Sequence, residues 1–211
     1  MEENHLKYLL FGEKEVRSLD NFIKEISNPV IIRKVFPNLC DPCAGVKYGE
    51  VHSYFITYLG VLGASLGYIP IVEPTILNIT TKIYTGEKTQ ESKKPDTVWK
   101  NLTQNSRYSN FAFFEFEGVS SANHLIGKTK NLIKMYEDAE NKPNSLILMY
   151  WKQKGQIIKD DVKKCRDVFS KGFVIDKVKI PKPDAQFFII ETRIVRNRVN
   201  TYYFDGFVLI E

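Results

Sequence analysis

The chain has 211 residues, of which 43% are hydrophobic and 13% aromatic, enough to bury the core of one domain. No apolar run approaches the roughly 18 to 20 residues of a membrane span, and the N-terminus begins with acidic residues, so neither a transmembrane helix nor a signal peptide is predicted. We therefore expect a soluble, cytoplasmic protein. The net charge of +5 is mildly basic and favours a polyanionic partner, although a lysine-rich solvated surface would give the same charge.

The first half of the chain predicts mainly helices. A nearly all-apolar helix is expected from Gly49 to Gly67, with Glu50 in its first turn, where an acid is favourable against the helix dipole. Before it, the pattern predicts helices at residues 3–11 and 18–28 and then an irregular segment broken by Pro29, Pro37 and Pro42. After it, residues 68–76 and 79–84 predict a strand and its continuation or hairpin partner, and residues 85–94 a polar loop.

The second half alternates strands and helices. An aromatic strand is expected at residues 111–117, followed by a helix that ends near Ala139 and has a serine as its N-cap. The other elements expected from the pattern are a buried strand at 146–151, a helix at 160–171, and strands at 173–180, 187–195 and 202–210, the last two joined as a hairpin.

This order of elements predicts an α/β (α+β) fold with a central mixed β-sheet flanked by helices. We expect a single domain over residues 1–211. It comprises an N-terminal helical segment (1–47), a core (48–152), and a helix plus a β-rich C-terminal extension (153–211).

Three carboxylates stand out around the aromatic strand. Because side chains alternate along a strand, Phe111, Phe113, Glu115 and Glu117 are predicted to share one face. Two acids on an apolar strand are costly to bury without a positive charge beside them. If the preceding turn folds residues 97–99 back beside this strand, Asp96 joins them, and three acidic groups converge as a hard cation such as Mg²⁺ requires.

These residues carry a resemblance to a known family. Pro95-Asp96, then 18 residues, then Glu115-Phe116-Glu117, between a helix before and a helix after, resembles the PD-(D/E)xK nuclease superfamily over about residues 48–152. The resemblance implies a restriction-endonuclease-like core, with Asp96 and Glu115 as metal ligands and Glu50 as an auxiliary acidic ligand.

Glu117 departs from the family pattern, because most members have lysine at this position. The resemblance allows two replacements: Glu117 itself takes the catalytic role, as in the E-x-E version of the motif, or a lysine from the following helix, Lys128 or Lys130, reaches in. A relative that has lost its activity is left open by the same departure.

No rival chemistry is predicted. The sequence contains no Walker loop, no G-x-S-x-G and no Rossmann glycine pattern, and its three histidines, including His52, are interpreted as ordinary helix residues. Cys40 and Cys43 have the spacing of half a zinc site, but two thiols at a turn are the preferred interpretation. Pro183-Asp184 and Glu191-Thr-Arg193 mimic the acidic motif, yet only six residues separate them, so they are interpreted as part of a hairpin.

We therefore expect a Mg²⁺-dependent endonuclease acting on double-stranded DNA, most similar to a type II restriction enzyme and acting as a homodimer. The alternatives are a repair or recombination nuclease such as a junction resolvase, and an inactive nucleic-acid-binding module of the same fold. The candidate DNA-binding residues are Arg193, Arg196, Asn197, Arg198 and Asn200 near the terminal hairpin, and the phosphate-binding lysines Lys152, Lys154, Lys163 and Lys164.

Overall fold

The computed structural model describes residues 19–73, 94–102, 108–152 and 159–210. The predicted helix at 3–11 and the predicted strand at 79–84 lie outside these ranges. The helices are α2 (Leu19–Ile26), α3 (Pro29–Val35), α4 (Val51–Ser65), α5 (Ala122–Asp138) and α6 (Lys159–Lys171), with short 3₁₀ turns η1 (Asn38–Cys40) and η2 (Tyr48–Glu50). The strands are β1 (Ile69–Val72), β2 (Thr97–Leu102), β3 (Tyr108–Val119), β4 (Ser145–Lys152), β5 (Phe173–Ile175), β6 (Val178–Ile180), β7 (Gln186–Arg196) and β8 (Tyr202–Ile210).

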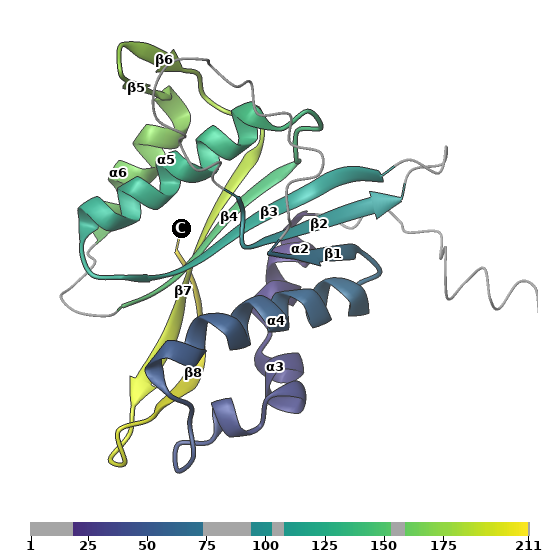
Figure 1. The fold of residues 1–211 in the computed structure, drawn as a ribbon, viewed down its shortest axis with the longest axis vertical. Helices are drawn as coiled ribbons and strands as arrows, with labels where there is room; N and C mark the ends of the chain where they lie inside the picture. The colour runs from purple at the N-terminus through teal and green to yellow at the C-terminus, as the bar shows by residue number, and fades with distance from the viewer. Residues whose placement is uncertain (1–18, 74–93, 103–107, 153–158, 211) are drawn as a thin grey trace, which may run out of the picture.

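A six-stranded mixed sheet forms the centre of the fold, in the order β1-β2-β3-β4-β7-β8 (Figure 1). Three consecutive inner strands, β3, β4 and β7, are parallel, and antiparallel pairs extend the sheet at both edges. The predicted α/β class, a mixed sheet with flanking helices, is confirmed. None of the helices in the described ranges combines the length and apolar character needed to cross a membrane.

The two C-terminal strands belong to this central sheet. β7 pairs in parallel with β4, and β8 follows as the predicted hairpin partner of β7, so these strands are not an extension beside the core. What stands apart is the short hairpin of β5 and β6. Sequence patterns do not reveal which strands become neighbours, because α6 carries the chain across the sheet before β7 begins.

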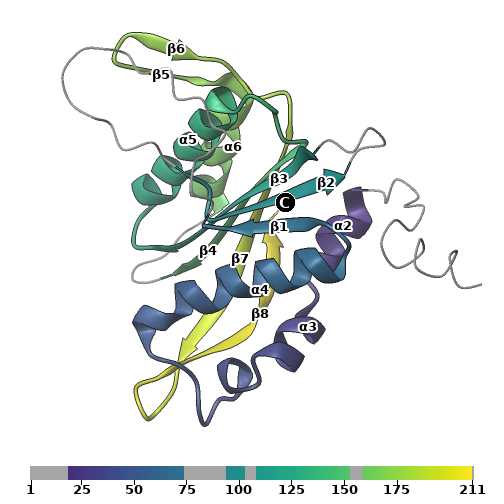
Figure 2. The ribbon, with the colours of Figure 1, turned by 45° about the vertical axis from the view of Figure 1, so that its right-hand side comes forward.

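Helices cover both faces of the sheet and enclose two separate cores. Figures 1 and 2 show α2, α3 and α4 on one side and α5 and α6 on the other. Alternate residues of β3 serve the two sides: Phe114 and Phe116 pack in the core under α4, whereas Phe113 packs in the core under α5. The sheet therefore separates two apolar layers, and a polar side chain on β3 belongs to one or the other.

Helix ends follow local chemistry. Ser121 caps α5 as predicted, because its hydroxyl accepts a hydrogen bond from the backbone N–H of His124. Pro29 separates α2 from the next element as predicted, but the segment after it is not irregular: Pro29 begins α3, where its missing N–H costs nothing and Asn28 supplies the cap. Gly67, with φ of 77°, turns the chain after α4 as expected.

A β-bulge corrects one predicted face. The register between β2 and β3 shifts between Trp99 and Lys100: Trp99 faces Ala112, but Lys100 faces Asn110, so the register skips Phe111. Phe111 consequently turns to the α4 side, where its ring stacks on Tyr68 with centroids 4.6 Å apart. The predicted alternation holds from Phe113 onward.

Two helical glycines give a matched stability test. A Cβ at Gly63 would lie 2.7 Å from Nε1 of the buried Trp99, whereas a Cβ at Gly127 in α5 would meet nothing within 4 Å. We expect Gly63→Ala to lower the free energy of unfolding by about 1–3 kcal/mol, because the indole also donates a hydrogen bond to the carbonyl of Leu59 and cannot shift freely. Gly127→Ala should raise it by about 0.5–1 kcal/mol through helix propensity. Urea denaturation of both variants checks this, and equal effects would contradict the packing argument.

Candidate active site

Asp96 lies where β1, β2 and β3 meet. Its Oδ2 accepts a hydrogen bond from the backbone N–H of Phe116 at 2.7 Å, and its carbonyl accepts one from the N–H of Glu73 at 2.7 Å. The register pairs the next residue, Thr97, with Phe114, so Asp96 is placed beside Glu115. β2 thus pairs antiparallel with β3 as predicted, and Asp96 reaches the aromatic strand.

The two glutamates of β3 point to the α5 side of the sheet, on the same face as Phe113. Glu115 is 5% exposed and Glu117 is partly buried. A carboxylate as buried as Glu115 needs a compensating charge or a proton. The structure supplies the charge from α5.

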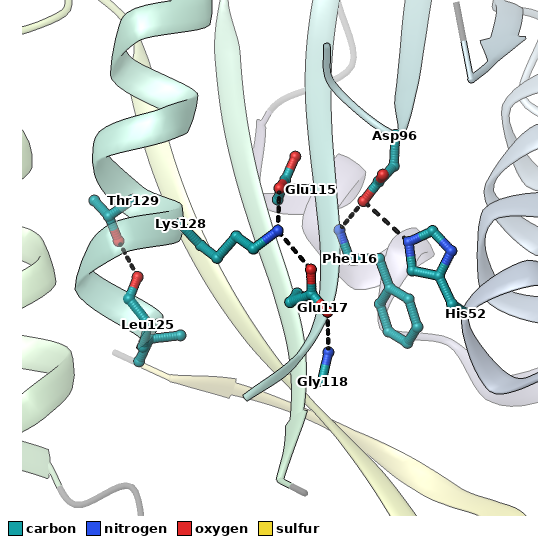
Figure 3. A network of polar contacts seen from close by, with 9 residues as sticks. All are labelled: His52, Asp96, Glu115, Phe116, Glu117, Gly118, Leu125, Lys128 and Thr129. Carbon is teal, nitrogen blue, oxygen red and sulfur yellow. Dashed lines mark hydrogen bonds and ion pairs between the residues drawn. The ribbon is translucent and has the colours of Figure 1, made fainter. Parts of the chain in front are cut away.

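Lys128 of α5 reaches between the two glutamates. Its Nζ lies 3.0 Å from Oε1 of Glu115 and 2.5 Å from Oε2 of Glu117 (Figure 3). The other oxygen of Glu117 accepts a hydrogen bond from the N–H of Gly118 at 3.1 Å. Lys130 is two positions further along the helix and faces another direction, with its Nζ 5.4 Å from the ring centre of Phe173. Of the two candidate lysines, Lys128 is the one that reaches the acidic residues.

Glu115 has an unusual electrostatic environment. Burial raises the pKa of this carboxyl to about 7, and the negative charge of Asp96 adds to the effect, while Lys128 opposes it. Its second oxygen, Oε2, is buried and has no hydrogen-bond partner among the described residues. Burial alone would lower the pKa of Lys128, but the charge of Glu115 and hydrogen bonds to Glu117 and Glu115 outweigh it and raise that pKa. A lysine held in this way stays charged.

His52 also belongs to the site, although its sequence context gave no indication of this. It projects from α4, on the other side of the sheet, and its Nε2 lies 3.4 Å from Oδ2 of Asp96 (Figure 3). Its ring lies 6.0 Å, centre to centre, from that of Phe116. The hydrogen bond to Asp96 raises the pKa of His52 against the opposing effect of burial. A polar residue near the start of an otherwise apolar helix is not specific enough to have identified it.

Glu50, the predicted auxiliary ligand, has a different place. It is exposed at the start of α4, and its Oε2 accepts a hydrogen bond from the backbone N–H of Lys47 at 3.0 Å. Glu50 thus satisfies a free donor at the helix start. From α4, it is His52 that contacts Asp96.

The predicted DNA-binding residues fall into three groups. Arg193 and Arg198 are exposed, as contact with DNA bases would require. Arg196 and Asn197 are engaged within the hairpin: the Arg196 guanidinium donates to the side chain of Asn200, and Asn197 bonds Pro42, Val199 and Thr201. On the sheet and α6, Lys152 pairs with Glu191 at 2.9 Å, Lys164 pairs with Asp161, Lys163 is exposed, and Lys154 lies outside the described residues.

The predicted convergence of three acidic groups is not found. Within the described ranges, no three His, Cys, Asp or Glu side chains are grouped to hold a metal ion, and this includes Cys40 and Cys43. The physical reason at β3 is that Lys128 lies between Glu115 and Glu117. Mg²⁺ nevertheless keeps several waters and is usually bound by one or two carboxylates. Asp96 and Glu115, with the unpartnered Oε2 of Glu115, fit that requirement.

Comparisons with protein-family models, with curated proteins and with solved structures found no match to this chain.

The raised pKa of Glu115 predicts how stability depends on pH. Between its ordinary value of 4.5 and about 7, Glu115 holds a proton in the folded protein but not in the unfolded chain. The folded state therefore binds more protons, and the free energy of unfolding falls as pH rises through this window. The raised pKa of His52 acts in the same direction at higher pH.

We expect urea denaturation to show a smaller loss of stability from pH 5 to pH 8 in Glu115→Gln than in the parent protein. Each pKa unit is worth about 1.4 kcal/mol, so the difference should be on the order of a few kcal/mol. Glu140→Gln, which removes an exposed carboxyl, is the control and should leave the decline unchanged. An unaltered decline in Glu115→Gln would refute the assignment.

Proposed function

We propose that this protein is a Mg²⁺-dependent endonuclease that hydrolyses DNA phosphodiester bonds at Asp96, Glu115 and Lys128. The observation that carries the proposal is the placement of Lys128. From α5 it supplies the lysine that the sequence motif lacks. Its Nζ lies 3.0 Å from Oε1 of Glu115, which is on β3 beside Asp96. A lysine of α5, a carboxylate of β3 and the carboxylate of the residue before β2 are thus near enough to influence one another's charge.

In this proposal Asp96 and Glu115 hold the cation. Bound Mg²⁺ would neutralise charge on the phosphate and lower the pKa of a coordinated water. Asp96 is pre-positioned for this role, because the contacts of Oδ2 with the N–H of Phe116 and with His52 hold the carboxylate in place. Its other oxygen, Oδ1, would then bind the cation. Glu115 must lose its proton to act as a ligand, so its raised pKa makes cation binding weaker below about pH 7.

Lys128 would hold the attacking water and balance the charge that develops on the phosphate. Glu117 is then a positioning residue. Its carboxylate lies 2.5 Å from Lys128 Nζ and is itself fixed by the N–H of Gly118. The acid at the motif position therefore does not replace lysine; it anchors a lysine that comes from the helix.

The finer proposal is a cytoplasmic type II restriction enzyme that cuts double-stranded DNA as a homodimer. A two-fold axis would place two such sites on the two strands of a palindrome. The exposed Arg198 supports sequence reading, since arginine bonds guanine bidentately. A junction resolvase with the same site would instead cut branched DNA selectively.

One observation favours a second candidate, a DNA-binding protein without catalysis. Lys128 already pairs with both glutamates, so the charges of Glu115 and Glu117 are partly neutralised without any metal ion. In such a protein the ion pairs would only join α5 to β3.

Lys128→Met and Lys130→Met separate these candidates. With supercoiled plasmid and Mg²⁺, we expect Lys128→Met to reduce the cleavage rate about 10²- to 10³-fold, because transition-state charge is left uncompensated. Lys130→Met should cleave like the parent protein, since Lys130 faces Phe173. Glu117→Gln should lose roughly tenfold, the effect of one weakened charge contact.

Asp96→Asn and Glu115→Gln should abolish cleavage while leaving binding of duplex DNA in place. Discrete plasmid fragments would identify a restriction enzyme, and cutting confined to branched substrates a resolvase. Binding without cleavage by the parent protein, at any Mg²⁺ concentration tested, would leave the non-catalytic candidate standing and overturn the nuclease.

A further inference from the structure

A second polar cluster lies on the same face of the sheet as the candidate active site. Its centre is Glu191 of β7, whose Oε2 accepts a hydrogen bond from the hydroxyl of Tyr150 at 3.1 Å and lies 2.9 Å from Nζ of Lys152. Glu191 belongs to the second apparent acidic motif of the sequence. Its nearest partners come from β4, not from a hairpin turn.

The sheet register connects this cluster to the active site. Glu117 of β3 is paired with Tyr150 of β4, and Tyr150 is paired with Glu191 of β7. Three residues therefore form one row across three parallel strands. Strands are about 4.8 Å apart, so Glu191 lies roughly 10 Å from Glu117.

The members of this cluster are exposed to solvent to different degrees, and their roles differ accordingly. Tyr150 is 1% exposed, so its hydroxyl is available to hydrogen-bond Glu191 but not to contact a ligand at the surface. The side chains of Glu191 and Lys152 are 17% and 37% exposed. Lysine has three donors, and Glu191 takes one of them, so Lys152 has donors left for a ligand at the surface.

Arg193 adds a second cation at this position. It follows Glu191 by two residues on β7 and so points to the same face. Its partner across the β7–β8 pair is Gly206, where a Cβ would meet nothing within 4 Å, so the space beside the exposed Arg193 is open. Two cations against one carboxylate leave an excess positive charge, and an anion is the ligand that this balance favours.

We propose that Lys152 and Arg193 form an anion subsite that binds a second phosphate of the substrate, with Glu191 and Tyr150 as positioning residues for Lys152. This inference rests on the proposed nuclease function and specifies its substrate class. Phosphates recur along a polynucleotide strand, one for each nucleotide, so a second phosphate about 10 Å from the reacting one belongs to a nearby nucleotide of the same chain. The substrate is therefore a polynucleotide chain and not a small molecule with a single phosphodiester.

The first experiment measures binding without any divalent cation, so that cleavage plays no part. Fluorescence anisotropy with a duplex oligonucleotide gives the affinity and its dependence on salt concentration. We expect Lys152→Gln to weaken binding several-fold and to reduce the salt slope by about 1, the loss of one phosphate contact. Lys34→Gln is the matched control, because it removes the same charge from an exposed position on α3, on the opposite side of the sheet (Figure 2). Equal effects of the two variants would overturn the subsite.

Glu191→Gln tests the positioning role by the sign of its effect. A general attraction between the protein and DNA would make this variant bind more tightly, because it removes a negative charge. Loss of the anchor of Lys152 predicts weaker binding instead. Tighter binding with an unchanged salt slope would refute the positioning role of Glu191.

The second experiment compares two substrates of the proposed nuclease. Lys152→Gln should lower kcat/KM for a duplex oligonucleotide by a clearly larger factor than kcat/KM for bis(p-nitrophenyl) phosphate, which has one phosphodiester. An equal loss with both substrates would contradict a separate subsite. If the parent protein binds duplex DNA but hydrolyses neither substrate, the nuclease fails, while the anisotropy experiment still decides the anion subsite.

Discussion

The hydrogen bond from the Phe116 backbone to Asp96 is the contact on which the site depends. It lies one residue before β2 begins and extends the pairing of β2 with β3 through a side chain. Because the acceptor is the carboxylate of Asp96, this hydrogen bond at the end of the β2–β3 pair also brings a negative charge beside the buried Glu115. Burial, and after it the charge of Asp96, raises the pKa of Glu115, while Lys128 from α5 opposes the shift. On the α4 side, His52 pairs with Asp96 itself.

The two helices contribute differently to this balance. Lys128 crosses to β3 and lies between two carboxylates, so its position is determined by charge as much as by packing. His52 contacts a single oxygen of Asp96, and its ring rests near Phe116 in the α4-side core. A neutral imidazole can keep that contact by donating its Nε2 hydrogen, whereas a protonated one adds a full charge. The α4 side can thus tune the charge of the site without entering its α5 side.

Much of the fold and part of the site could be predicted from the sequence because the relevant signals are local. Period-two alternation identified β3 and placed Glu115 and Glu117 together, and the expected antiparallel pairing of β2 with β3 placed Asp96 beside them. Phe111 was placed on the wrong face because a bulge depends on pairing with β2, which alternation does not encode. Lys128 and Lys130 could be proposed but not separated, since rotation of α5 about its axis is fixed by packing. His52 and Glu191 act through contacts 44 and 41 residues away, with Asp96 and Tyr150. No spacing rule reaches across that distance.

Parallel pairing of β3, β4 and β7 has a consequence beyond stability. Equivalent positions on neighbouring parallel strands form straight rows, so a polar residue near the C-terminal end of one strand acquires polar neighbours on the next at a regular spacing. Glu117, Tyr150 and Glu191 form such a row, flanked by Lys128 at one end and by Lys152 and Arg193 at the other. A substrate with one charge would use one end of this row and leave the other cations without a partner. A chain of phosphates offers one negative charge to the cations at each end of the row, and this is the physical reason why we propose a polynucleotide substrate.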